Sequence, residues 1–292
     1  MIGFTSFKRI LLATATLGFA AHAAASTLTL DVYNPGEKAI FPVTSVLVSG
    51  EKDAILVDAQ FGKSQAEQVV EKIRASGKQL TTIYISHGDP DYYFGLDTLT
   101  AAFPDAKVLA SQPTVDHIKQ TVDGKLAFWG PKMGGDVPAK TIVPGVLKGD
   151  SLMLEGQKLQ VVGLEGKQPD RTFVWIPSIK AVVGGVVVAE NIHVWMADTQ
   201  TAQSHADWLA TLHSIETLKP HTLVPGHYLG ESARSLAAVQ FTADYIKAFD
   251  EETAKAKDAA ALIAAMKKRY PTLGEESSLE LSAKVAKGEM KW

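Results

Sequence analysis

The sequence contains no cysteine among its 292 residues. This absence excludes a disulfide framework, a thiolate metal site, a thiol nucleophile and a lipid-modified cysteine. An exported protein can do without disulfides when its hydrophobic core is large enough. Hydrophobic residues make up 46% of this chain. We therefore expect a sizeable core, in one large domain or in one domain with an added helical segment.

The chain also lacks an excess of basic residues. Lysine and arginine number 29, aspartate and glutamate number 32, and the formal net charge is -3. No stretch of the sequence is polybasic, so the positive field that nucleic-acid binding requires is missing. We therefore expect a small-molecule substrate and no nucleic-acid partner.

Long hydrophobic runs are missing as well. The longest, Ile10 to Ala21, is too short for a comfortable membrane span of about 20 apolar residues. It follows Lys8-Arg9 and precedes small residues up to Ala25, which are the three parts of a secretory signal peptide. We predict a signal peptide over residues 1–25 and no stable membrane insertion after its cleavage; an uncleaved anchor is the alternative. The mature protein is then periplasmic or secreted.

Short apolar runs bounded by turn residues predict two β-rich halves, each closed by helices. The expected elements are strands over 45–49 and 54–58, a helix over 64–76, a strand ending near Ile85, short strands between 151 and 188, and helices over 204–218 and in 235–292. The first two strands form a hairpin, and the later strands predict a second β layer.

Residues 123–138 combine glycine and proline with aromatic residues. Gly130-Pro131 and Gly134-Gly135 are typical of loops, while Phe128 and Trp129 suggest a packed surface. The pattern therefore predicts either a lid over a site or a packed surface loop, and the sequence leaves both open.

The most informative run is Ser86 to Phe94, which reads SHGDPDYYF. It follows a β-type run and precedes a helix-like run, so its side chains lie at the carboxyl end of a strand, where open α/β sheets build their sites. His87, Asp89 and Asp91 are residue types that bind metals. Without a metal, the two aspartates remain a close carboxylate pair that can serve as acid and base or merely cap the loop.

Other site types have little support. Gly62-Lys63-Ser64 lacks the first glycine of a phosphate-binding loop, and neither G-x-S-x-G nor G-x-G-x-x-G occurs. We interpret four histidines of helical or loop segments as structural, namely His193, His205, His213 and His221.

Two halves of strands and helices, with metal-type residues at strand ends, resemble the metallo-β-lactamase fold. The resemblance spans about residues 40–230. It implies an α/β fold class, a four-layered αββα sandwich, with a C-terminal helical extension. The implied domains are residues 26–232 for the metallo-β-lactamase-like domain and 233–292 for the extension.

The resemblance includes the family's metal-binding pattern, in altered form. The family's loop reads His-x-His-x-Asp-His, and the matching residues here are His87, Asp89, Asp91 and Tyr92. Tyrosine is a poor ligand unless it is ionised, and its ordinary pKa of about 10 makes ionisation costly. His227, at the end of a strand, is similar to the family's last ligand.

The other elements of the pattern depart further. Asp58 resembles the aspartate that supports the metal loop. The family's glycine-histidine pair is best matched by Gly163 to Gly166, which supplies Glu165, with Asp170 as a competitor in the same loop. Its glycine-aspartate pair, which bridges two metals, is matched by Gly184-Gly185. Loss of that aspartate argues against a two-zinc centre.

From the resemblance we predict at most one divalent ion, held by His87, Asp89, Asp91, His227 and Glu165. Such an oxygen-rich set favours manganese, iron or magnesium over zinc, which stays a candidate. Asp91 is the predicted catalytic residue, orienting a metal-bound water or accepting its proton for hydrolysis of an ester, lactone or amide. The alternative is an inactive periplasmic binding or scaffold protein without metal, favoured if Glu165 points away, so whether the chain is an enzyme stays open.

Overall fold

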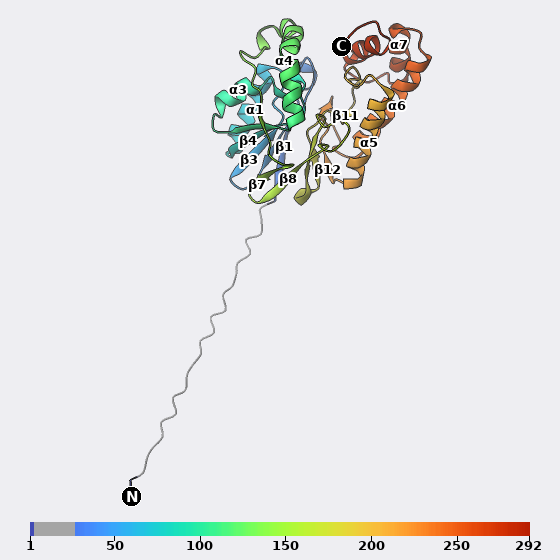
Figure 1. The fold of residues 1–292 in the computed structure, drawn as a ribbon. Helices are drawn as coiled ribbons and strands as arrows, with labels where there is room; N and C mark the ends of the chain where they lie inside the picture. The colour runs from blue at the N-terminus through green and yellow to red at the C-terminus, as the bar shows by residue number, and fades with distance from the viewer. Residues whose placement is uncertain (3–26) are drawn as a thin grey trace.

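Two β-sheets lie face to face, and helices cover both outer faces (Figure 1). The structure is a computed structural model and describes residues 1–2 and 27–292. The predicted signal peptide lies almost entirely outside the described residues. Within the described part of the chain, no helix combines the length and the apolar character needed to cross a membrane.

The first sheet has six strands, which neighbour one another in chain order. They are β1 (Thr29–Tyr33), β2 (Ser45–Ser49), β3 (Asp53–Val57), β4 (Gln79–Ile85), β5 (Lys107–Ala110) and β6 (Gly145–Val146). The strands β1 to β3 pair antiparallel and β3 to β6 pair parallel. The connecting helices are α1 (Lys63–Ser76), α2 (Pro90–Tyr93), α3 (Leu96–Ala102) and α4 (Gln112–Met133). The predicted hairpin and the first predicted helix are confirmed.

The second sheet has five strands in the order β12-β10-β9-β8-β7. They are β7 (Ser151–Leu154), β8 (Gln157–Val162), β9 (Phe173–Ile176), β10 (Ala181–Val183) and β12 (Thr222–Leu223). A separate parallel pair consists of β11 (Ala189–Glu190) and β13 (His227–Tyr228). The remaining helices are α5 (Ala202–Leu218), α6 (Ala237–Lys255), α7 (Ala259–Arg269) and α8 (Glu276–Ala286), and short 3-10 turns lie at Gly36–Lys38, Gly134–Asp136 and Pro177–Ile179.

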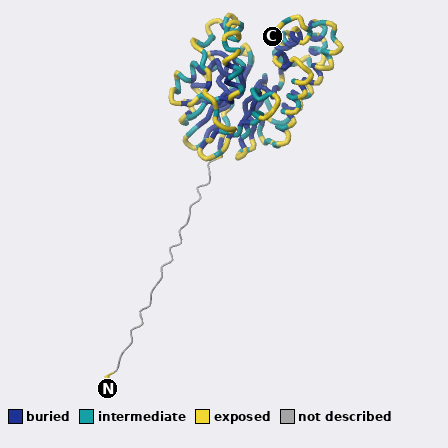
Figure 2. The backbone as a smooth tube through the Cα atoms, viewed as in Figure 1, coloured by how far each residue is buried: buried dark blue, intermediate teal, exposed yellow. Residues whose placement is uncertain are grey.

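Alternating side chains on the strands build one hydrophobic layer between the sheets and others beneath the helices. On β2, Val46 and Val48 face the second sheet, while Leu47 faces the helices. On β9, Val174 faces the first sheet and Phe173 faces the other way. Strands buried on both faces require such continuous apolar runs. Figure 2 shows these central strands as buried, which confirms the predicted αββα sandwich.

Residues 123–133 are the second half of α4, so the predicted loop over 123–138 is wrong for most of its length. Pro131 lies in the last turn of the helix, where its missing N–H removes one i→i−4 hydrogen bond but leaves the preceding turns of the helix intact. Trp129 packs edge-on against Phe61, with ring centroids 5.4 Å apart. Tertiary packing thus overrides the local helix-breaking signal.

His193 joins the C-terminal extension to the rest of the fold. Its backbone N–H donates to the carbonyl of Gly274 at 2.8 Å, and its ring Nδ1 lies 3.0 Å from the Tyr245 hydroxyl on α6. The side chain is buried, and this burial lowers the pKa of His193 to about 4; Glu276 has a smaller raising effect, and Lys267 a smaller lowering one.

We expect His193 to make the folded state sensitive to mild acid. Its folded pKa lies below the unfolded value of about 6.5, so its contribution is complete above pH 6.5 and is lost as pH falls toward 4. His193→Gln should flatten the fall of the urea-unfolding midpoint between pH 7 and 4. The matched control is His213→Gln, at an exposed histidine of α5, which should keep the wild-type profile. Identical profiles for all three proteins would refute this prediction.

Candidate functional site

A cavity of about 640 Å³ lies between α4 and the C-terminal residues, which Figure 1 places at the same end of the molecule. Its walls include His87 and Asp89 from the loop after β4, Lys125 from α4, Arg171 from the loop before β9, and Trp292. A much smaller space of about 40 Å³ adjoins it and shares Asp89, Lys125 and Trp292 with it.

Asp58 holds the loop that carries His87 and Asp89. It directly follows β3, which runs parallel to β4, so its carboxylate meets Ser86. The carboxylate accepts hydrogen bonds from the Ser86 backbone N–H at 2.8 Å and from its hydroxyl at 2.7 Å. That hydroxyl in turn accepts from the backbone N–H of Gly185 at 2.8 Å. Burial raises the pKa of Asp58 to about 7, and the bonds from Ser86 oppose the rise. The predicted supporting role of Asp58 is confirmed.

Both ring nitrogens of His87 face hydrogen-bond acceptors. Nδ1 lies 3.1 Å from the backbone carbonyl of Asp170, and Nε2 lies 3.1 Å from the Asp89 carboxylate. A carbonyl and an ionised carboxylate only accept, so both nitrogens donate and the ring is an imidazolium. Burial alone would lower the pKa of His87, but the adjacent Asp89 outweighs it and the pKa is raised.

Asp89 lies among three basic side chains. One oxygen faces His87, and the other lies 3.2 Å from Lys125 Nζ and 3.9 Å from His117 Nε2. Burial would raise the pKa of Asp89, yet these neighbours, His87 foremost, hold it well below its usual range. Burial of the ammonium would lower the pKa of Lys125, but the charges of Asp89 and Asp198 and the hydrogen bond to Asp89 together outweigh burial, so this pKa is raised. Two cations therefore face Asp89, the imidazolium of His87 from its own loop and the ammonium of Lys125 from α4.

His227 is fixed as a neutral ring. Its Nδ1 donates to the carbonyl of Pro42 at 2.7 Å, so its Nε2 accepts from the Tyr92 hydroxyl at 2.8 Å. Burial lowers the pKa of His227 to about 4. Asp91 Oδ2 lies 3.5 Å from the same Nε2 and has no hydrogen-bond partner among the described residues. Burial, and then the charge of Asp89, raises the pKa of Asp91 well above its ordinary value.

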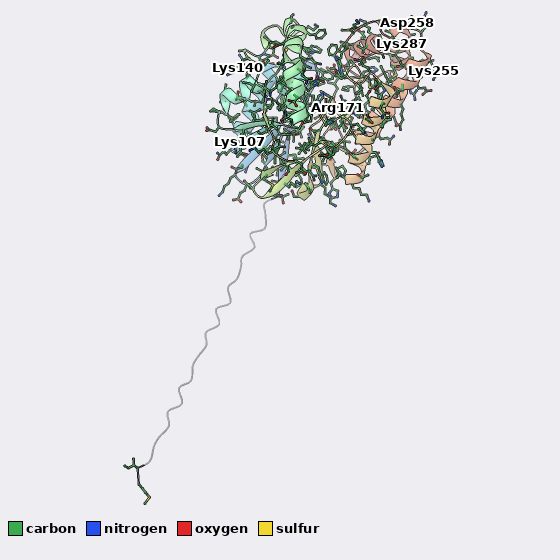
Figure 3. The ribbon with its side chains drawn as sticks, viewed as in Figure 1. Lys107, Lys140, Arg171, Lys255, Asp258 and Lys287 are labelled. Atoms are coloured by element: carbon green, nitrogen blue, oxygen red, sulfur yellow. The ribbon has the colours of Figure 1, made fainter. Side chains whose placement is uncertain are left out.

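Arg171 is a buried cation in the wall of the large cavity. Its side chain belongs to a residue only 6% exposed, and its guanidinium carbon lies 4.5 Å from the ring centroid of Trp208. Within the described part of the chain, Nε and Nη2 have no hydrogen-bond partner. Figure 3 labels Arg171 near the middle of the molecule, between α4 and the C-terminal helices.

The structure places four of the five predicted metal ligands as two neighbouring pairs, His87 with Asp89 and Asp91 with His227. It does not bring Glu165 to them. Glu165 is exposed and lines a separate cavity of about 500 Å³. The competing Asp170 of the same loop does reach the site, but through its backbone carbonyl rather than its carboxylate.

These four residues do not fit a metal ion in the arrangement that they adopt. Among residues 1–2 and 27–292, no group of three or more histidine, aspartate or glutamate side chains is placed to hold one. The nitrogens that would bind a metal are already engaged, Nε2 of His87 by Asp89 and Nε2 of His227 by Tyr92. The donor chemistry therefore argues against a preformed metal centre.

Several residues of the site carry no sequence motif and were not predicted. His117 and Lys125 lie eight positions apart, which places them on one face of α4, and helical periodicity could have paired them if residues 123–133 had been read as a helix. Arg171 and Trp292 have no local signal, since only the folded chain brings them to the cavity.

We expect the aspartate that the family pattern places at position 185 to be incompatible with this backbone. A Cβ on Gly185 would meet the Thr172 carbonyl oxygen at 2.3 Å, and its φ of 87° disfavours any side chain. Gly185→Asp should therefore destabilise the protein by about 3 kcal/mol or more, as strain and overpacking combine. The matched control is Gly230→Asp, where φ is 68° but no atom lies within 4 Å. It should lose only about 1–2 kcal/mol in urea unfolding, and equal losses would contradict the steric argument.

Comparisons with known proteins agree with this architecture. The sequence model of the metallo-beta-lactamase superfamily matches residues 40–227. The crystal structure of the DIM-1 metallo-beta-lactamase is similar with a TM-score of 0.56 at 15% identity, covering 77% of this chain and 99% of that one. A metallo-beta-lactamase from Pontibacter korlensis is similar with a TM-score of 0.56 at 17% identity, covering 76% and 99%.

A shorter match links the chain to a curated protein described as "Uncharacterized protein YobT" of Bacillus subtilis (strain 168). It is 36% identical over 74 residues, which span 25% of this chain and 31% of that protein. The likeness to the solved structures concerns the fold, whereas the family match covers more than half of the sequence. The chain belongs to the metallo-beta-lactamase superfamily.

Proposed function

We propose that this chain binds an anionic small molecule in the 640 Å³ cavity and does so without a metal ion. The observation that carries the proposal is the buried guanidinium of Arg171, two nitrogens of which lack a partner among the described residues. A buried charge without a partner is unfavourable, so an anion that pairs with it gains strong charge-assisted hydrogen bonds. Stacking on Trp208 keeps the guanidinium rigid, which suits the planar, two-point recognition of a carboxylate or phosphate.

The other charges near the cavity support the same reading. Two cations, His87 and Lys125, share the single carboxylate of Asp89, which leaves a positive excess within this triad. Asp198 lies 4.0 Å from Lys125 but accepts hydrogen bonds from two indole N–H groups. An incoming anion therefore meets Arg171 beside a triad with one more cation than carboxylate, and the same cavity wall also carries Asp170 and Asp198.

Metal-dependent hydrolysis of an ester, lactone or amide is the second candidate function. Members of the superfamily usually bind divalent metals, and His87, Asp89, Asp91 and His227 lie around one loop. In this candidate Asp91 is the catalytic residue. Against it, metal binding would have to break the pairing of His87 with Asp89 and that of His227 with Tyr92. We therefore place it behind anion binding.

The setting of this function is also a proposal. The pattern of residues 1–25 supports export to the periplasm or the medium, where the mature protein meets small solutes. The slight negative charge of the chain supports a small-molecule partner rather than a nucleic acid.

We expect anion binding to depend on Arg171. Calorimetric titration with acetate and with inorganic phosphate, each in the presence of a chelator, separates a carboxylate site from a phosphate site. Arg171→Gln should weaken the binding of the preferred anion by about tenfold or more, because a charge-assisted hydrogen bond contributes about 1.5–3 kcal/mol.

The matched control is Lys291→Gln, which removes the same charge from an exposed residue of the same cavity wall. It should change affinity by no more than about threefold, since exposed charges contribute about 1 kcal/mol or less. Equal effects of the two substitutions, or binding that survives Arg171→Gln unchanged, would reject Arg171 as the anion-binding group.

We expect the protein to contain no stoichiometric metal when it is purified from its own compartment without a chelator. The measurement is elemental analysis beside the double variant His87→Ala, His227→Ala. Metal content should be equal in the two proteins, because the candidate ligands are paired with one another. Close to one equivalent of manganese, iron or zinc that disappears in the double variant would instead establish the metal-dependent hydrolase.

A further inference from the structure

Trp292 lines both cavities, as do Asp89 and Lys125. It lines the large one, where Arg171 lies, and also the 40 Å³ space, whose walls include Phe41, Trp129 and Trp195. A space of this size holds a water molecule or two, and no ring fits into it. The aromatic compartment is therefore filled by the protein's own indole.

Four contacts hold the indole of Trp292. Its Nε1 donates to Asp198 at 2.6 Å, and Lys125 Nζ lies 4.6 Å from the ring centroid. Phe128 and Trp195 meet it edge-on, each with ring centroids 5.2 Å apart. Together these contacts provide one hydrogen-bond acceptor, one cation over the face and two aromatic edges, which is the environment of a bound aromatic ligand.

Only the side chain fastens Trp292 to the fold. Among the described residues, no backbone hydrogen bond involves Lys291 or Trp292, whereas Met290 and Glu289 still bond to Lys284 near the end of α8. Withdrawal of the indole thus breaks one hydrogen bond and the ring contacts, and it disturbs no helix or strand.

We propose that Trp292 occupies the position that an aromatic ring of the ligand takes. The ligand is then a small molecule that carries an anionic group and a flat ring with an N–H donor. The anionic group pairs with Arg171, and the ring replaces the indole beside Asp198 and Lys125. This inference rests on the proposed anion-binding function and adds the chemical class of the ligand, with Trp292 as an internal competitor.

The test compares two probes that differ only in the ring, indole-3-acetate and acetate, by calorimetric titration. Trp292→Ala should bind indole-3-acetate about tenfold more tightly than the wild type, because the competing indole is gone. Its affinity for acetate should stay unchanged. Met153→Ala is the control, since Met153 is exposed on β7 and lines neither cavity, and it should bind both probes as the wild type does.

A second variant guards against loss of folding. Trp292→Phe keeps an aromatic ring but loses the hydrogen bond to Asp198, so it should bind indole-3-acetate with intermediate affinity. Thermal unfolding of every variant verifies that it is folded.

If neither Trp292 variant gains affinity for indole-3-acetate, the inference is wrong. The proposed function is judged separately by the acetate titrations, because dependence of acetate binding on Arg171 would sustain it even then. Loss of both effects would reject the inference and carboxylate binding at Arg171 together.

Discussion

The hydrogen-bond chain from Gly185 through Ser86 to Asp58 is the interaction on which the rest of the site depends. It joins the end of β3 to the loop after β4, and it ties both to the turn after β10 in the second sheet. The Thr172 hydroxyl closes the junction by donating to the Ser86 carbonyl at 2.8 Å. Leaving any one of these buried donors unpaired would reduce the stability of the folded protein by about 1–3 kcal/mol. The position of His87, the next residue, is set by this junction.

The ion cluster of His87, Asp89 and Lys125 lies directly beside this junction. The ammonium of Lys125 neutralises Asp89 as a metal ion would, but an ammonium has no open coordination position and cannot generate a metal-bound hydroxide. His87 also differs from a metal ligand. It donates both of its N–H groups and has no lone pair left to bind a metal ion. In this arrangement Nε2 of His87 and Nε2 of His227 are not free to bind a metal ion.

Sequence reasoning predicted what side-chain patterns determine. Short apolar runs such as those of β2 and β9 predicted the two sheets, and the resemblance of Asp58 to the family's strand-end aspartate predicted its support of the loop. Sequence reasoning failed where tertiary packing determines the secondary structure, or where backbone atoms make the contact. The second half of α4 is helical despite Pro131, and the loop after β8 meets His87 through the carbonyl of Asp170, a group that every residue possesses. No residue pattern can reveal such a contact.

Asp198 links the ionic and aromatic parts of the cavity, and this link limits how selective the site can be. It accepts from the Trp292 indole and lies 4.0 Å from Lys125, yet it is partly exposed to solvent. If a ring without an N–H donor displaced the indole, water would donate a hydrogen bond to the Asp198 oxygen, which would therefore not be left unpaired. Rings with and without an N–H donor should then differ in binding free energy by one ordinary hydrogen bond, about 0.5–1.5 kcal/mol, which is a several-fold difference in affinity. Stronger discrimination has to come from the anionic group, because Arg171 is buried and water compensates it poorly.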